Sequence, residues 1–144
     1  MPKRPTYDQL LARDRLKATR KRPGEAEHKL QCQCFQWFNW THRDLQGLLY
    51  AVPNGGHRNY VTAAKLKAEG VVSGVSDLNL DVARHGYHGL RIELKTETGR
   101  QSPSQRAWQK KVEAQGYRYV LVRGYREFCE TVDAYLDECC LNEL

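Results

Sequence analysis

The sequence of 144 residues predicts one α/β domain, α+β by a stricter definition, in which a mixed sheet has helices on both faces. Three observations predict it. Apolar residues recur at helical spacing in several segments, short apolar runs are bounded by Gly and Pro, and residues 77–82 and 90–95 alternate strictly between polar and apolar. The predicted order is helix, strand, helix, strand, strand, helix, strand, helix, after a first basic helix.

The first two predicted helices are separated by Pro23-Gly24, the only plausible boundary in the chain. Segment 6–22 has three leucines among many charges and ends in a basic run, so we expect residues 1–22 to form a basic N-terminal helix or arm and residues 23–144 to form the domain. From Glu25 to about Trp40 the apolar residues follow helical spacing, and the first turn carries acids, as the helix dipole favours.

The middle of the chain predicts a short strand followed by a helix. Residues 48–52 form an apolar run that a Pro-Asn-Gly-Gly turn closes, which is typical of a buried strand. The next helix is expected from about Asn59, a possible N-cap, to Glu69, with Gly70 as its stop signal.

Residues 77–83 and 89–95 predict a hairpin that turns at 84–88. Over residues 77–82 and 90–95 the even positions are apolar and the odd positions are polar, so the two sets lie on opposite faces. If the turn centres near Gly86, Asp77 lies across from Glu93 or Lys95, and the three share the polar face at the open end of the hairpin.

The last third of the chain predicts a helix, a strand and a second helix. Ser102 is the expected N-cap of the first helix, with Pro103 at its first position, and Gly116 follows its end. Residues 117–122 form a β-rich run, and the apolar residues between Phe128 and Cys139 mark an amphipathic helix.

Charge and composition favour nucleic acid as the partner. Twenty-three Lys and Arg against 17 Asp and Glu leave a formal charge of +6. No apolar run approaches the ~20 residues needed to span a bilayer, and the basic N-terminus lacks the apolar centre of a signal peptide, so we expect a cytoplasmic protein without membrane association. Five cysteines without a CxxC pair and five scattered histidines argue against a disulfide framework and a zinc site.

Two carboxylates and an ammonium at one end of a sheet predict a phosphodiester hydrolysis site. Carboxylate oxygens suit Mg²⁺ or Mn²⁺, and a neighbouring lysine stabilises negative charge that develops on a phosphate. The alternative is an amphipathic hairpin whose solvated polar face carries the ion pairs Asp81–Arg91 and Asp77–Lys95. The hairpin by itself fits both interpretations.

Five ordered motifs resemble a known family. Asp77 followed by Ile92-Glu93-Leu94-Lys95 is similar to the PD-(D/E)XK nuclease signature, although Ser76 stands where that signature has proline. Together with segments 52–56, 66–71, 73–78 and 102–108, it resembles the VRR-Nuc family, the virus-type replication-repair nucleases, over about residues 25–136. The resemblance implies a restriction-endonuclease-like core, with residues 23–144 as a VRR-Nuc nuclease domain.

The resemblance also implies roles for single residues. Asp77, Glu93 and the backbone carbonyl of Leu94 would bind Mg²⁺ or Mn²⁺, and Lys95 would assist the attacking water. Glu27 matches an acid that such families place on their first core helix near the metal, possibly as an indirect ligand. The family also has a glutamine beside the active site at the position of Gln105. This residue has capping-box spacing from Ser102, so it could instead reach back to its own helix N-cap.

A second group of residues could bind DNA without sequence choice. The loop residues Asn54, Gly55, Gly56 and Arg58 could approach a phosphate near a helix N-terminus, or could form an ordinary strand-to-helix turn. Lys65 and Lys67 could hold phosphates or form a solvated face.

The expected function is a metal-dependent, structure-selective DNA endonuclease. Stand-alone members of the family resemble Holliday-junction resolvases, which act as homodimers, so the resemblance favours a phage enzyme of that kind acting on branched DNA. The alternatives are a nicking, flap or restriction-like nuclease of the same fold, and a non-catalytic DNA-binding module.

Overall fold

The computed structural model describes residues 24–53 and 60–137, so the expected N-terminal helix and the loop from Asn54 to Arg58 lie outside the described residues. The described elements, in chain order, are α2 (Glu25–Thr41), the short 3-10 helix η1 (Arg43–Leu45), β1 (Leu49–Ala51), α3 (Tyr60–Ala68), β2 (Leu78–Leu80), β3 (Leu90–Leu94), α4 (Pro103–Ala114), β4 (Arg118–Val122) and α5 (Tyr125–Leu136). The predicted order of helices and strands is confirmed, with η1 as the one described element that was not expected.

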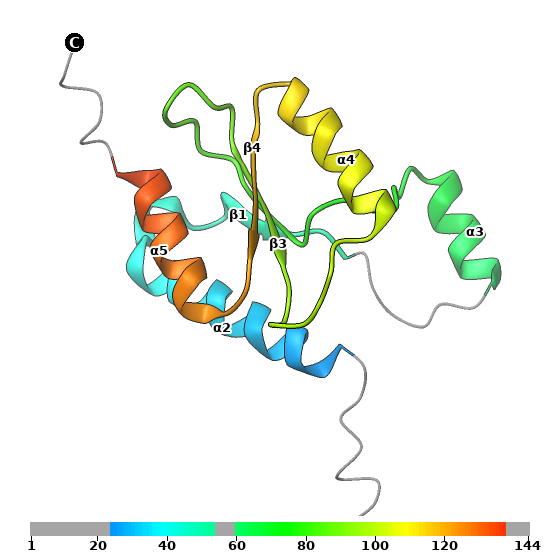
Figure 1. The fold of residues 1–144 in the computed structure, drawn as a ribbon, viewed down its shortest axis with the longest axis horizontal. Helices are drawn as coiled ribbons and strands as arrows, with labels where there is room; N and C mark the ends of the chain where they lie inside the picture. The colour runs from blue at the N-terminus through cyan, green and yellow to red at the C-terminus, as the bar shows by residue number, and fades with distance from the viewer. Residues whose placement is uncertain (1–23, 54–59, 138–144) are drawn as a thin grey trace, which may run out of the picture.

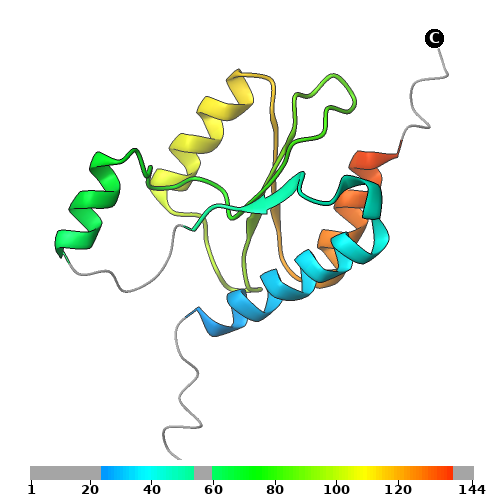
Figure 2. The ribbon, with the colours of Figure 1, turned by 180° about the vertical axis from the view of Figure 1, so that it is seen from behind.

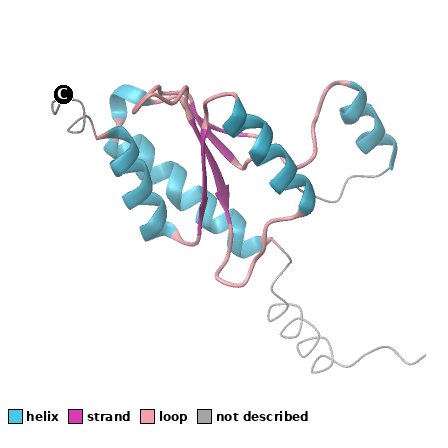
Figure 3. Cartoon of the chain, turned by 45° about the horizontal axis from the view of Figure 1, so that its top comes forward, coloured by secondary structure: helices cyan, strands magenta, loops and turns pink. Residues whose placement is uncertain are grey.

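The four described strands form one mixed sheet in the order β1-β2-β3-β4 (Figure 1), with β3 and β4 parallel and the other two pairs antiparallel. Helices α2 and α5 cover one face, and α4 lies on the other (Figure 3). The predicted mixed sheet with helices on both faces is therefore confirmed.

The main core lies between the sheet and the α2–α5 layer. It contains the even-numbered apolar residues of β2 and β3 together with apolar side chains of the two helices, among them Cys34, Phe38, Phe128, Val132 and Tyr135. Burying these side chains is the dominant favourable contribution to folding. This layer holds the open end of the hairpin in a fixed position.

The hairpin is tighter than predicted. Its turn is His85-Gly86, not the five residues 84–88, because Arg84 and Tyr87 form an isolated bridge and both intervening residues have positive φ, 51° and 80°. Positive φ at both central positions is the type I′ geometry that matches the twist of two-residue hairpins. The regular strands β2 and β3 are correspondingly shorter than the runs 77–83 and 89–95.

Half of the six polar residues on the hairpin face are buried, namely Asn79, Arg91 and Glu93, so the alternative of a solvated ion-pair face is wrong. Arg91 bonds Asp81 Oδ1 at 2.8 Å, as that alternative expected, but Arg91 is buried and its guanidinium lies 4.2 Å from the centre of the Tyr117 ring. Lys95 pairs with Glu93 and not with Asp77. Helix α4 lies on this face and β4 extends the sheet beside β3, which hairpin periodicity alone does not reveal.

Helix α3 lies at the periphery of the molecule, away from the sheet (Figures 1 and 2). None of its described side chains is buried, and Val61 is 75% exposed. The helix ends as predicted, with Gly70 at φ 100° and the Val71 N–H bonded to the Leu66 carbonyl. In the part of the chain that the structure describes, no helix is long and apolar enough to cross a membrane.

Candidate active site

The ends of β2 and β3 bring two carboxylates together. Leu78 pairs with Ile92, and continuing this register by one residue places Asp77 opposite Glu93. Asp77 Oδ2 accepts a hydrogen bond of 2.8 Å from the Leu94 N–H. The carbonyl of a strand residue projects to the same side as its N–H, so the Leu94 carbonyl also lies toward Asp77. Of the two partners predicted for Asp77, the register thus selects Glu93.

Glu93 is an acid in a buried position, with a side chain 1% exposed. Its Oε1 contacts Lys95 Nζ at 3.3 Å and accepts a hydrogen bond from Gln105 Nε2, and its Oε2 accepts one of 3.4 Å from the Tyr119 hydroxyl. Burial, followed by the nearby Asp77 charge, raises the pKa of Glu93 from 4.5 to about 7, although Lys95 opposes the shift. The lysine and the two hydrogen-bond donors therefore offset only part of the cost of ionising this buried carboxyl group.

The pKa of Asp77 is also raised. Burial is the largest cause, and the negative charge of Glu27 adds to it, while the Leu94 N–H and Lys95 act in the opposite direction. Glu27 and Asp77 line the same cavity, so the first turn of α2 lies close to the end of the hairpin. Two neighbouring acids whose pKa values are both raised, with a lysine beside them, are typical of a functional site.

Gln105 combines the two roles that the sequence left open. Its Oε1 accepts the Ser102 N–H at 2.8 Å, and its own N–H donates to Ser102 Oγ at 3.2 Å, which completes a capping box at the start of α4. Its Nε2 donates to Glu93. The cap thus fixes the rotamer that presents the amide to the buried carboxylate.

The loop before Asp77 packs directly on the start of α4. A Cβ atom at Gly74, where φ is 86°, would lie 2.5 Å from the Ser104 carbonyl oxygen, so only glycine fits this contact. Two residues further on, the buried Ser76 hydroxyl donates to Asn79 Oδ1 at 2.7 Å. These contacts hold Asp77 and Gln105 in a fixed relation.

The predicted catalytic residues line one cavity of about 300 Å³. Its lining includes Glu27, Asp77, Glu93, Lys95 and Gln105. Three serines also line it, and the sequence analysis assigned none of them to the site: Ser73 of the loop before Asp77, the N-cap Ser102 and Ser104 in the first turn of α4.

The residues present fit a hard divalent cation. The described residues contain no group of three or more His, Cys, Asp and Glu side chains arranged to hold an ion. The potential ligands are instead the carboxylates of Asp77 and Glu93 and the Leu94 carbonyl, with Glu27 further out. Mg²⁺ prefers such a set because it takes one or two carboxylates and keeps several waters.

Of the predicted DNA-binding residues, the structure describes only Lys65 and Lys67, which are exposed on the peripheral helix α3 and do not line this cavity. Asn54, Gly55, Gly56 and Arg58 lie outside the described residues. Sequence analysis also missed Tyr119, whose hydroxyl reaches Glu93 from β4. Tyr119 reaches Glu93 because β4 pairs in parallel with β3. The sequence of β4 predicts a strand but does not show which strand it pairs with.

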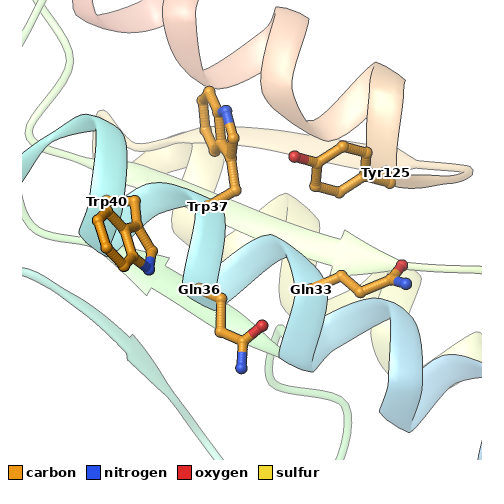
Figure 4. A pocket seen from close by; sticks show the side chains of 5 residues that line it. All are labelled: Gln33, Gln36, Trp37, Trp40 and Tyr125. Atoms are coloured by element: carbon orange, nitrogen blue, oxygen red, sulfur yellow. The ribbon is translucent and has the colours of Figure 1, made fainter.

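A second cavity, of about 670 Å³, lies between α2 and α5 and is lined by Gln33, Gln36, Trp37, Trp40 and Tyr125 (Figure 4). Trp37 and Tyr125 lie on facing sides of this cavity, one from each helix. Its described lining has no carboxylate and no lysine. It therefore lacks the groups for metal-assisted hydrolysis, although it is larger than the cavity at Glu93.

A mixed sheet that holds two acids and a lysine at the end of a hairpin, with a helix acid and a glutamine beside them, defines a nuclease domain with a PD-(D/E)XK-like core. The VRR-NUC domain model matches residues 11–126, and this chain belongs to that family. A solved structure described as a VRR_NUC domain protein is similar, with 28% identity and a TM-score of 0.65 over 76% of this chain and 87% of that chain. No curated protein gives a significant match.

Proposed function

We propose that this chain is a Mg²⁺- or Mn²⁺-dependent endonuclease that cleaves branched DNA, acting as a homodimer in the manner of a Holliday-junction resolvase. The observation that carries the proposal is the single cavity in which Asp77, Glu93 and Lys95 meet. Membership of a nuclease family supports the reaction class, and the formal charge of +6 supports DNA as the substrate.

The two carboxylates and the Leu94 carbonyl would hold the cation. When bound, it supplies positive charge that offsets both carboxylates and the charge that develops on the phosphodiester. Lys95 is 13% exposed and its Nζ lies 3.3 Å from Glu93 Oε1, so the carboxylate fixes the ammonium where it can orient the attacking water. Gln105 holds Glu93 from the other side.

A homodimer follows from the symmetry of the proposed substrate. A four-way junction needs two related cuts, and each copy of this chain has one cavity with these acids. Light scattering at micromolar concentration tests this part: a dimeric mass is expected, and a monomeric mass would contradict it.

The test of activity is cleavage of labelled four-way junction, flap and linear duplex DNA with Mg²⁺, Mn²⁺ or EDTA. We compare the wild type with Asp77→Asn, Lys95→Ala and the control Lys110→Ala, which removes an exposed lysine of α4. We expect symmetric, metal-dependent cuts on the junction that are lost in the first two variants and kept in the third.

Other results point to the alternatives. Cleavage of flap or linear DNA in preference to the junction would support the nuclease activity and overturn the junction preference. DNA binding without cleavage under any metal condition would indicate a non-catalytic binding module.

A further inference from the structure

A groove of about 860 Å³ adjoins the catalytic cavity on the other side of Asp77. It runs between α2 and β1, and its lining includes Phe35 from the helix and Leu49 and Ala51 from the strand. Glu27 and Asp77 line both the groove and the cavity that contains Glu93, so the two spaces adjoin each other at these acids. A volume in the range of ~300–1,000 Å³ is typical of ligand pockets.

The charge of the groove excludes a phosphate backbone as its occupant. Its described lining contains no Lys or Arg, and its two acids are at the end shared with the cavity. The remaining surface is largely apolar, with Leu49 and Leu78 buried beneath it and Phe35 39% exposed. A neutral, flat group with an apolar face fits this surface.

Strand β1, which forms one wall of the groove, carries backbone N–H and C=O groups that pair with no other described strand. Asp81 N–H bonds the Leu48 carbonyl, and Val52 N–H bonds the Asp77 carbonyl, so the residues between them alternate in direction. The N–H and C=O groups of Leu49 and Ala51 therefore point away from β2. Because β1 is an outer strand of the described sheet, no described strand pairs with them.

We propose that this groove receives the base of an unpaired nucleotide next to the scissile phosphate, stacked on Phe35 with its edge toward the outer backbone of β1. The inference rests on the proposed function: the groove adjoins the catalytic acids, so its occupant is part of the DNA that those acids cleave. An unpaired base at a branch or bulge enters the groove directly, whereas a base in linear duplex must first be unpaired and unstacked. The groove is thus a source of structure selectivity.

The test compares binding of two duplexes in EDTA, and again with Ca²⁺, one with a single unpaired 2-aminopurine nucleotide and one fully paired. Phe35→Ala removes the stacking surface, Phe35→Leu keeps apolar contact without an aromatic ring, and Phe35→Trp restores the ring. The matched control is Trp40→Ala, because Trp40 is 73% exposed on a different face of the same helix.

We expect wild-type protein to bind the unpaired duplex more tightly and to quench its 2-aminopurine fluorescence. Phe35→Ala and Phe35→Leu should weaken binding of the unpaired duplex roughly ten-fold, leave the paired duplex unchanged and lose the quenching. Phe35→Trp should restore both signals, and Trp40→Ala should alter neither.

The proposal is overturned if Phe35→Ala weakens binding of both duplexes equally or leaves binding of both unchanged. It is also overturned if the substitution changes the oligomeric state, because the groove would then hold a second copy of the chain. If the binding results are as expected and no form cleaves DNA, the groove assignment is supported and the proposed nuclease activity is contradicted.

Discussion

Replacing Glu93 by Gln in the metal-free protein should stabilise the fold above pH 7. The pKa of Glu93 is about 7 in the folded chain and 4.5 as its ordinary value. The folded state therefore binds more protons between these values, and stability is lost as the pH rises through that window. At about 1.4 kcal/mol per pH unit, the ionised side chain costs about 3 kcal/mol by pH 7. Glutamine has a similar shape and avoids this cost.

The assay is thermal denaturation in EDTA from pH 4 to pH 8.5. The two proteins should melt alike near pH 4, where the unfolded and folded carboxyl groups are both largely protonated. Above pH 7 the Glu93→Gln protein should melt on the order of 10 °C higher. Addition of Mn²⁺ should raise the melting temperature of the wild type much more than that of the variant, because only the wild type retains both carboxylates.

The matched control is Glu130→Gln, which removes an exposed acid that pairs with Arg126 on α5. It should change the melting temperature little at any pH. Parallel melting curves for wild type and Glu93→Gln across the whole pH range would refute the reasoning that burial beside Asp77 makes Glu93 costly to ionise. Equal stabilisation of both proteins by Mn²⁺ would refute the assignment of Glu93 as a ligand.

Gly74→Ala should destabilise the fold by at least about 2 kcal/mol in urea denaturation, because its Cβ would lie 2.5 Å from the Ser104 carbonyl oxygen at a φ of 86°; an unchanged midpoint would contradict this contact. Tyr135→Phe should cost about 1–3 kcal/mol by the same measurement, since it removes the 2.7 Å hydrogen bond to the buried Val82 carbonyl. Gln105→Ala should lower stability by about 1 kcal/mol through loss of the capping box, and should also lower the rate of DNA cleavage; a normal rate would limit Gln105 to the helix cap.

The strict alternation of residues 77–82 and 90–95 made the hairpin the most predictable part of the fold. Side chains alternate with a period of exactly two, so the pattern specified both faces and restricted the partner of Asp77 to two residues. The structure selects Glu93. The turn was less predictable, because the pattern does not show that His85 adopts a positive φ and shortens the turn to two residues.

Burial of the polar face could not be predicted from the hairpin. It depends on the packing of α4 on that face and on the pairing of β4 beside β3, which are long-range properties of the chain. For the same reason Tyr119 was missed, although its hydroxyl reaches Glu93. Gln105 shows a different limit: its spacing from Ser102 indicated a cap and the family resemblance indicated the active site, and one amide side chain does both through its two ends.

The free-energy cost of ionising Asp77 and Glu93 and the chemistry of the adjoining groove follow from one arrangement at the end of the sheet. Asp77 lies directly before β2, where its carboxylate meets the Leu94 N–H, and it lines both the cavity with Lys95 and the groove whose described lining has no Lys or Arg. A nucleotide that presents its phosphate to Lys95 therefore has its base beside the groove. A strand whose base is already unpaired binds there without the unstacking cost of an intact duplex. Selectivity for branched DNA would then arise beside the catalytic acids themselves.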